Sequence, residues 1–248
     1  MGMMQWFHRL ASPRHFFDIS GRLLPWLTGI TLILFAAGLY LGLFVAPADY
    51  QQGESYRIMF IHVPAAWMSM FTYVVLAVAS VIGMVWRIKL ADLVARASAP
   101  IGAWFTFLAL ITGSLWGKPM WGAWWVWDAR LTSELILLFI YLAYMALHAA
   151  FDDPRTAARV AGLFAVVGLV NIPIIHYSVE WWNTLHQGAT VTKFDAPSIH
   201  PSMLAPLLLM AFAFKFYYAV VVLLRVRGMV LEREAGSAWV RELRGEAP

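Results

Sequence analysis

The sequence predicts an all-α, polytopic membrane protein with six transmembrane helices and both termini in the cytoplasm. Hydrophobic residues make up 61% of the 248 residues and charged residues only 13%, whereas about 25% of a soluble domain is charged. The apolar residues also fall in blocks, and a helix needs about 20 of them to cross a bilayer. Six such blocks can be read, at residues 23–46, 61–86, 99–116, 131–150, 160–179 and 202–224.

The distribution of lysine and arginine predicts the orientation, because these residues accumulate in cytoplasmic loops. Four lie on one side of the predicted membrane: Arg57, Lys118, Arg130 and Lys193. Thirteen lie on the side that holds both ends of the chain: Arg9, Arg14, Arg22, Arg87, Lys89, Arg96, Arg155, Arg159, Arg225, Arg227, Arg233, Arg241 and Arg244. We therefore expect a cytoplasmic segment 1–22, a membrane domain 23–224 and a cytoplasmic tail 225–248.

Four of the predicted spans have a distinctive local feature. Residues 1–22 lack a continuous apolar core, so the first span reads as an uncleaved signal anchor. His62 lies at the external mouth of the second, and Pro64 suits the first turn of a helix because its missing N–H costs nothing there. Pro173 should kink or tighten the outer part of the fifth span and free backbone groups near Asn171. Lys215 places a charge near the middle of the sixth, which makes it a candidate for a functional site.

Several classes of function are excluded. The chain contains no cysteine, so it has no disulfide, no thiolate ligand and no C-x-x-C-H attachment site for haem. Its net charge of +4 follows from the cytoplasmic arginines and needs no nucleic-acid partner. Neither a complete P-loop nor a G-x-S-x-G element is present, so any nucleotide hydrolysis must come from a partner.

The most distinctive segment is the second external loop, residues 116–131. Tryptophan collects at membrane interfaces as an anchoring belt, but a belt needs only one or two residues per helix end. Here five occur within twelve positions, followed by Asp128 and Arg130: Trp116, Trp121, Trp124, Trp125 and Trp127. This density favours a platform for a large flat ligand or a partner. If the segment is helical, Trp121, Trp125 and Asp128 share one face, and Trp124 and Trp127 another.

Four histidines lie on the same external side, each near the end of a span: His62, His176, His186 and His200. A single histidine is more often structural, but two that converge could hold a haem iron from both sides. The apolar macrocycle would need an aromatic surface, and its propionates would need cations. A zinc site is less favoured because no H-E-x-x-H or close histidine pair occurs.

These residues resemble a known family. The pattern Trp121-Gly-x-x-Trp125-x-Trp127-Asp128-x-Arg130-Leu-Thr is similar to the "WWD" signature of haem-handling membrane proteins in cytochrome c maturation. The segment that starts His62-Val-Pro-Ala-Ala and the segment 174–188 resemble the histidine segments that flank this signature. The length and the six spans match the smaller members, the haem exporter protein C (CcmC) family.

The resemblance implies that His62 and His186 are the axial ligands of haem b, and that the tryptophan segment from Trp116 to Asp128 is its platform. It also implies a site on the periplasmic face of the bacterial inner membrane. The partners would be a periplasmic haem chaperone that holds haem covalently, an ABC transporter pair (ATPase and permease) and a small single-span subunit. The chain would be a transfer or transport protein, not an enzyme, with an assisting role in attachment to the chaperone left open. Candidate propionate contacts are Arg57, Lys118 and Arg130, and candidate accessory residues are His176, Trp181 and Trp182.

Two other functions remain compatible with the residues alone. One is a b-type electron-transfer protein with two histidine ligands, although such ligands usually lie at membrane depth. The other is a permease subunit without haem, in which the tryptophans form a belt. For a haem exporter, the sequence is compatible both with passage of haem through this chain and with lateral arrival from the membrane.

Overall fold

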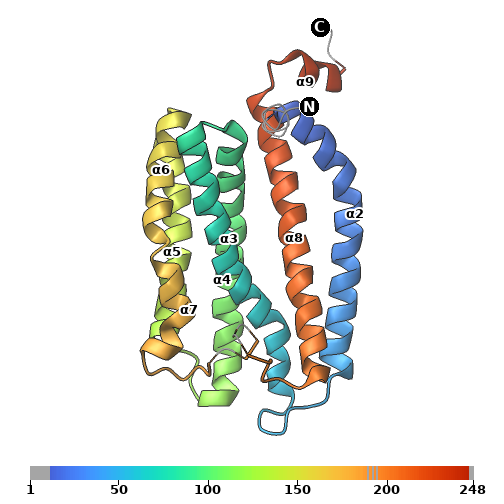
Figure 1. Cartoon of the computed structure of the whole chain (residues 1–248), viewed down its shortest axis with the longest axis vertical. Coiled ribbons are helices and arrows are strands. Elements are labelled where there is room, and N and C mark those ends of the chain that lie inside the picture. The colour runs from blue at the N-terminus through green and yellow to red at the C-terminus, as the bar shows by residue number, and fades with distance from the viewer. Residues whose placement is uncertain (1–11, 189, 192, 194, 246–248) are drawn as a thin grey trace.

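The computed structural model describes residues 12–188, 190–191, 193 and 195–245 of the chain, so Arg9 and the rest of residues 1–11 lie outside it. Within these ranges six helical spans are long and apolar enough to cross a membrane (Figure 1), which confirms the predicted all-α class. The helices are α2 (Pro13–Tyr40), α3 (Met59–Trp86), α4 (Lys89–Trp121), α5 (Ala129–Ala149), α6 (Pro154–Gly168), α7 (Asn171–Trp181), α8 (Pro201–Arg233) and α9 (Ala238–Leu243). A π-helical turn (Leu41–Val45) extends α2, and a 3-10 turn (Glu54–Ile58) leads into α3.

Local chemistry explains where several helices begin and end. Asp128 and Asp153 cap α5 and α6 by accepting hydrogen bonds from backbone N–H groups three residues on, as expected for an N-cap carboxylate. Helix α4 ends at Trp121, and its C-cap is Gly122, whose φ of 75° is left-handed and therefore favours glycine. The same helix starts at Lys89, ten residues before the predicted span 99–116, because it continues beyond the apolar block.

The fifth span is interrupted, in agreement with the predicted effect of Pro173. Helix α6 ends at Gly168 and α7 begins at Asn171. A proline has no N–H to donate to the carbonyl four residues earlier, and its ring crowds that carbonyl. The carbonyl of Leu169 instead accepts from the Ile172 N–H at 3.1 Å. The Asn171 amide donates to the Ser133 carbonyl at 2.9 Å and fastens the break to α5.

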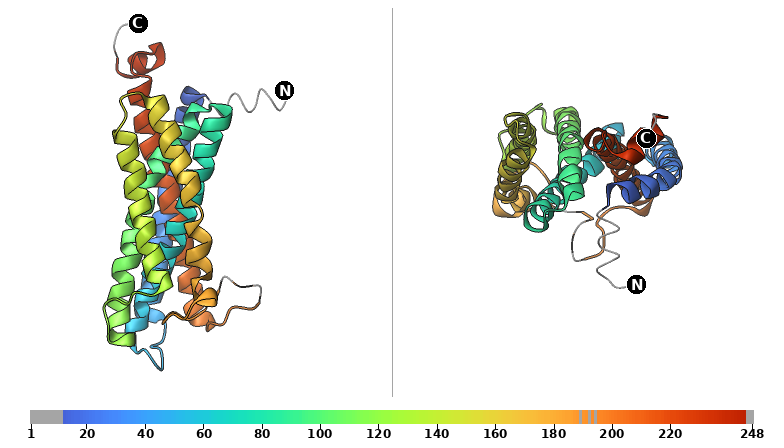
Figure 2. Two further views of the ribbon diagram at one scale, coloured as in Figure 1. Left: turned by 90° about the vertical axis from the view of Figure 1, so that its left-hand side faces the viewer. Right: turned by 90° about the horizontal axis from the view of Figure 1, so that it is seen from above.

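Helix α3 connects two groups of helices. It packs against α4 and α6 on one side and against α8 on the other, and α2 packs mainly on α8. Figures 1 and 2 show α3 running obliquely between the α2–α8 pair and the remaining helices. The inner face of α4 is lined by small residues such as Ala95 and Ala99, which allow close approach where no hydrophobic effect drives helices together. At Gly102 a Cβ atom would lie 2.1 Å from the Tyr141 ring.

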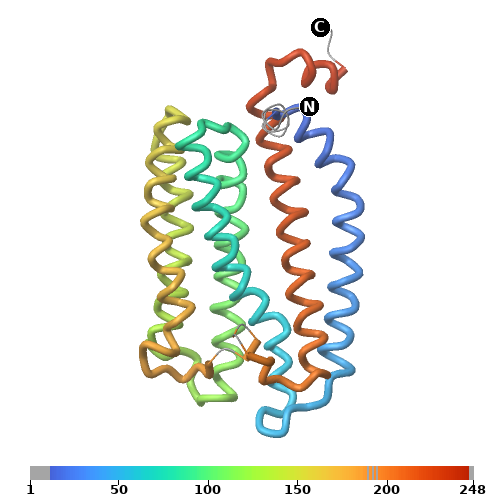
Figure 3. The backbone as a smooth tube through the Cα atoms, viewed as in Figure 1, coloured from blue at the N-terminus to red at the C-terminus, as the bar shows by residue number. Residues whose placement is uncertain are grey.

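The ends of the bundle differ in content. The start of α2 and the end of α8 lie together at one end, as the tube in Figure 3 makes clear. The end of α4, the end of α7 and the segment before α8 lie at the opposite end. Both predicted ligands, His62 and His186, belong to this second end. Lys215 is exposed on α8, with its ammonium 5.8 Å from the Phe71 ring centre.

Candidate functional site

A cavity of about 490 Å³ opens at the end of the bundle that carries the histidines and the tryptophan segment. Its walls come from α3, α4, α5 and α7 and from the loops before α3 and after α7. Five of the histidine and tryptophan candidates singled out from the sequence line it: His62, Trp116, Trp121, His176 and His186. The fold thus collects residues from four separate parts of the chain in one chamber.

His62 sits in the first turn of α3 and is fixed against α4. Its Nδ1 lies 3.0 Å from the Ala109 carbonyl and 3.1 Å from the Thr112 hydroxyl. A carbonyl can only accept a hydrogen bond, so Nδ1 carries the proton and Nε2 keeps a free electron pair. Gly113 makes this position possible, since a Cβ there would come within 3.0 Å of the imidazole. The ring of Trp116 meets His62 edge-on at 5.7 Å.

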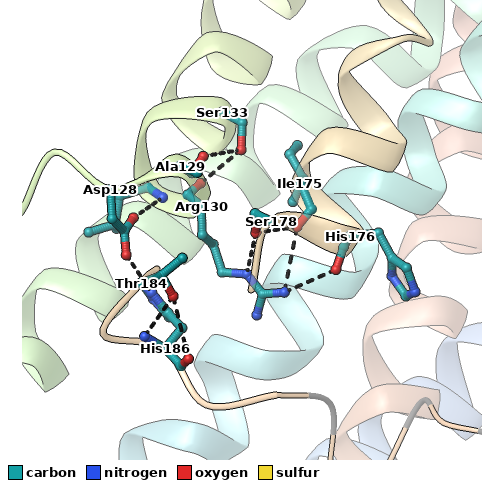
Figure 4. A network of polar contacts seen from close by, with 10 residues as sticks. Asp128, Ala129, Arg130, Ser133, Ile175, His176, Ser178, Thr184 and His186 are labelled. Atoms are coloured by element: carbon teal, nitrogen blue, oxygen red, sulfur yellow. Dashed lines mark hydrogen bonds and ion pairs between the residues drawn. The ribbon is translucent and has the colours of Figure 1, made fainter. Parts of the chain in front are cut away.

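His186 lies in the loop after α7 and is held by an acidic side chain. Its Nδ1 is 3.1 Å from Oδ2 of Asp128, and its ring lies 4.9 Å from that of Trp121. Burial lowers the pKa of the His186 imidazole below its ordinary value of 6.5, and the nearby Asp128 carboxylate offsets this only in part. His186 is therefore neutral near pH 7, the form in which an imidazole binds a metal. Figure 4 shows His186 and Asp128 facing each other.

The tryptophan segment divides into two parts. Only Trp116 and Trp121 line the cavity. Trp125 and Trp127 line a separate apolar groove between α4 and α5, and Trp124 is 56% exposed. Residues 122–128 are not helical, so the faces predicted for a helical segment do not form; the left-handed Gly122 turns the chain away from the α4 axis.

The three candidate propionate contacts occupy different surroundings. Arg130 lines the cavity, and its guanidinium donates to the Ser178 hydroxyl at 3.2 Å and to the carbonyls of Ile175 and His176 (Figure 4). Arg57 pairs with Glu54 and donates to the Gly42 carbonyl. Lys118 donates to the Gly122 carbonyl at 2.9 Å. Of the three, only Arg130 reaches the chamber.

The accessory candidates also separate. His176 lines the cavity and contacts Tyr177 edge-on, with ring centres 4.7 Å apart. Trp181 stacks on Tyr177 at 5.3 Å, and both Trp181 and Trp182 are at least half exposed, outside the chamber.

Glu134 and Gln52 line the cavity but were not among the site candidates; the sequence indicated Glu134 only as a possible partner of Arg130, four residues before it. Glu134 is 6% exposed and lines the inner wall, and its Oε1 has no hydrogen-bond partner among the described residues. A glutamate inside an apolar block is the signal that could have identified it. Gln52 accepts a hydrogen bond from the Trp116 indole at 2.9 Å and thereby orients that ring; nothing in its sequence surroundings marks it.

The fold and the site define a polytopic helical membrane protein with a cavity lined by histidine and tryptophan at one end of the bundle. The family model described as "Heme exporter protein C" (CcmC) matches residues 6–241. This chain therefore belongs to the CcmC family of haem exporters in cytochrome c biogenesis.

Curated relatives agree with the family match. Proteins named "Heme exporter protein C" from Escherichia coli K12 and Haemophilus influenzae are 53% and 52% identical to this chain, over 97% of it and 97% and 98% of their own lengths. The protein of the same name from Bradyrhizobium diazoefficiens is 54% identical over 92% of this chain and 86% of its own length. Among the three functions considered from the residues, family membership favours the haem exporter.

Proposed function

We propose that this protein binds haem b through His62 and His186 at the periplasmic face of the inner membrane and passes it to a periplasmic haem chaperone. Haem is the cargo here, not a resident cofactor. In this proposal the chamber holds the macrocycle, the two imidazoles hold the iron, and Arg130 attracts a propionate. An ATP-binding cassette pair and a small single-span subunit would complete the assembly.

One observation carries the proposal: two histidines line the same cavity, and each has its Nδ1 engaged by an acceptor. His62 donates to a backbone carbonyl and His186 faces a carboxylate. Histidine ligands of metals usually donate their other ring N–H to such a partner, which fixes the tautomer and leaves the second nitrogen for the metal. Nε2 of both residues is therefore left for an iron atom.

The remaining features of the chamber fit a haem group. Its volume of about 490 Å³ lies within the ~300–1,000 Å³ usual for small-molecule sites. The rings of Trp116 and Trp121 stand beside the two imidazoles, so an aromatic macrocycle would meet apolar rings next to its ligands. Arg130 supplies a cation at the same wall, as an anionic propionate requires.

The delivery step is supported by what lies outside the chamber. Trp124 and Trp127 are 56% and 75% exposed at the same end of the molecule. Aromatic side chains are common at the centre of protein interfaces. These two outer indoles would contact the chaperone or the membrane surface, while Trp116 and Trp121 face the haem.

Absorption spectroscopy of the detergent-solubilised protein tests haem binding. The wild type should show the Soret and α/β bands of six-coordinate, low-spin haem. His62→Ala and His186→Ala should each lose most of the retained haem, whereas His148→Ala, at the other end of the bundle, should retain it. His176 lines the same chamber but is not a proposed ligand, so His176→Ala should also retain haem. Wild-type haem content in either of the first two variants would reject the ligand assignment.

The absence of cysteine from the sequence makes the membrane side directly measurable. Single cysteines placed at Gln187, which lines the chamber, and at Arg155, in the first turn of α6, can be labelled in intact cells with an impermeant maleimide. The Gln187→Cys protein should be labelled once the outer membrane is permeabilised, and the Arg155→Cys protein only after lysis. The opposite pattern would place the chamber in the cytoplasm and remove the periplasmic delivery step.

A further inference from the structure

Asp128 uses each of its carboxylate oxygens for a different task. The residue is 9% exposed. Oδ1 accepts the Leu131 N–H at 2.8 Å and caps α5, and Oδ2 lies 3.1 Å from Nδ1 of His186 (Figure 4). The carboxylate therefore links the start of α5 to a loop residue 58 positions later in the chain.

The two candidate ligands are held by partners of different charge. An ionised carboxylate can only accept, so Nδ1 of His186 carries the proton and Nε2 does not. His62 has the same arrangement, but its partners are a neutral carbonyl and a hydroxyl. A carboxylate behind an imidazole makes it a more basic ligand. His186 should therefore be the stronger electron donor of the two.

We propose that Asp128 is a positioning residue that holds His186 in the tautomer and orientation required to bind haem iron. This inference rests on the proposed function. In this inference the acidic residue of the tryptophan segment acts on His186 and is not part of the aromatic surface that contacts the macrocycle. The N-cap makes the placement accurate, because the Leu131 N–H at the start of α5 holds one carboxylate oxygen while the other faces the imidazole.

Asparagine at this position separates the two tasks of the side chain. An amide keeps one oxygen and has an NH₂ donor in place of the other, so of the two positions that face Leu131 and His186 only one still holds an acceptor. If the oxygen caps α5, the NH₂ group faces Nδ1 of His186, which must then accept, and the proton moves to Nε2. In that tautomer Nε2 carries the proton and has no free electron pair for the iron. Asp128→Ser retains a capping oxygen but is too short to hold the imidazole.

The experiment compares Asp128→Asn, Asp128→Ser and a matched cap variant, Asp153→Asn. Asp153 caps α6 through Thr156 and is exposed in the loop before that helix. Haem-free protein in detergent is titrated with haem b, and the midpoint potential of the loaded protein is measured. Loss of a residue that orients a metal ligand typically weakens metal affinity ~10–100-fold. We expect this loss for both Asp128 variants and wild-type affinity for Asp153→Asn.

The midpoint potential provides a readout that loss of a helix cap would not change. Removal of the carboxylate makes His186 a weaker donor, so the residual haem in Asp128→Ser should have a higher potential than in the wild type. In a His186→Ala background, Asp128→Asn should cause no additional loss of affinity.

The outcomes separate this inference from the proposed function. If His186→Ala binds haem like the wild type, the ligand assignment itself is wrong. If His186→Ala loses haem while both Asp128 variants retain wild-type affinity and potential, the positioning role is overturned. The role is equally overturned if Asp128→Asn weakens binding to the same extent with and without His186.

Discussion

Gly113 offers a way to displace His62, the proposed haem ligand on α3, without weakening the fold. In Gly113→Ala the new Cβ would lie 3.0 Å from Cε1 of His62, and ordinary contact begins at 3.4 Å, so the ring must withdraw by 0.4 Å. Gly113, Ala109 and Thr112 all belong to α4. Withdrawal from α4 therefore lengthens the 3.0 Å bond to the Ala109 carbonyl to about 3.4 Å, beyond the usual range for N–H···O bonds.

Haem affinity should consequently fall about tenfold, or ~1.4 kcal/mol, the lower end of the range for loss of a group that orients a ligand. Stability should not fall, because alanine in a helix interior is favoured over glycine by ~1 kcal/mol. The assays are haem titration by absorbance and thermal unfolding of the haem-free protein. Gly228→Ala is the control, since nothing lies within 4 Å of its Cβ position. Unchanged affinity in Gly113→Ala would refute the reasoning that α4 positions His62.

Three further predictions concern acidity and packing. The pKa of His186 is lower in the folded protein than in the unfolded chain, so the unfolded chain binds this proton first as the pH falls below about 6.5. The free energy of unfolding and haem retention should therefore be constant above that pH and decline below it, which a pH series would measure. Tyr73→Phe removes a buried 2.9 Å bond to the Ala165 carbonyl and should cost about 1 kcal/mol in unfolding experiments. Gly168→Ala would place a Cβ 2.1 Å from the Tyr73 hydroxyl and should lower the free energy of unfolding by about 3 kcal/mol. The same substitution should cost less in a Tyr73→Phe background, and additive effects of the two substitutions would contradict this account.

The sequence was informative about the spans because a bilayer demands long apolar helices from any chain. The six blocks and the break caused by Pro173 needed only local reasoning. The extension of α4 back to Lys89 did not follow from hydropathy, since that measure detects the apolar part of a helix and not its ends. Gly122 is a turn signal, but its left-handed conformation alone does not tell where the tryptophans after it point.

The site was predictable by residue type and less so by arrangement. His62, His186 and the tryptophans stand out in composition, yet the split between Trp121 in the chamber and Trp127 outside depends on the path of a non-helical segment. The link between Asp128 and His186 joins positions 58 apart, and only tertiary packing decides such a contact. Glu134 is visible in the sequence as a charge in an apolar block, but its partners depend on how α3 and α5 meet.

No described side chain of α2 or α8 lines the cavity, and only 17% of the most apolar stretch of the α2 span is buried. Substitutions on the α2–α8 pair can affect the chamber only indirectly, through α3, α4 and the loops that join the pair to the rest of the bundle. The outer surfaces of α2 and α8 are consequently free to adapt to new lipids or neighbouring subunits while the haem-handling chemistry stays the same.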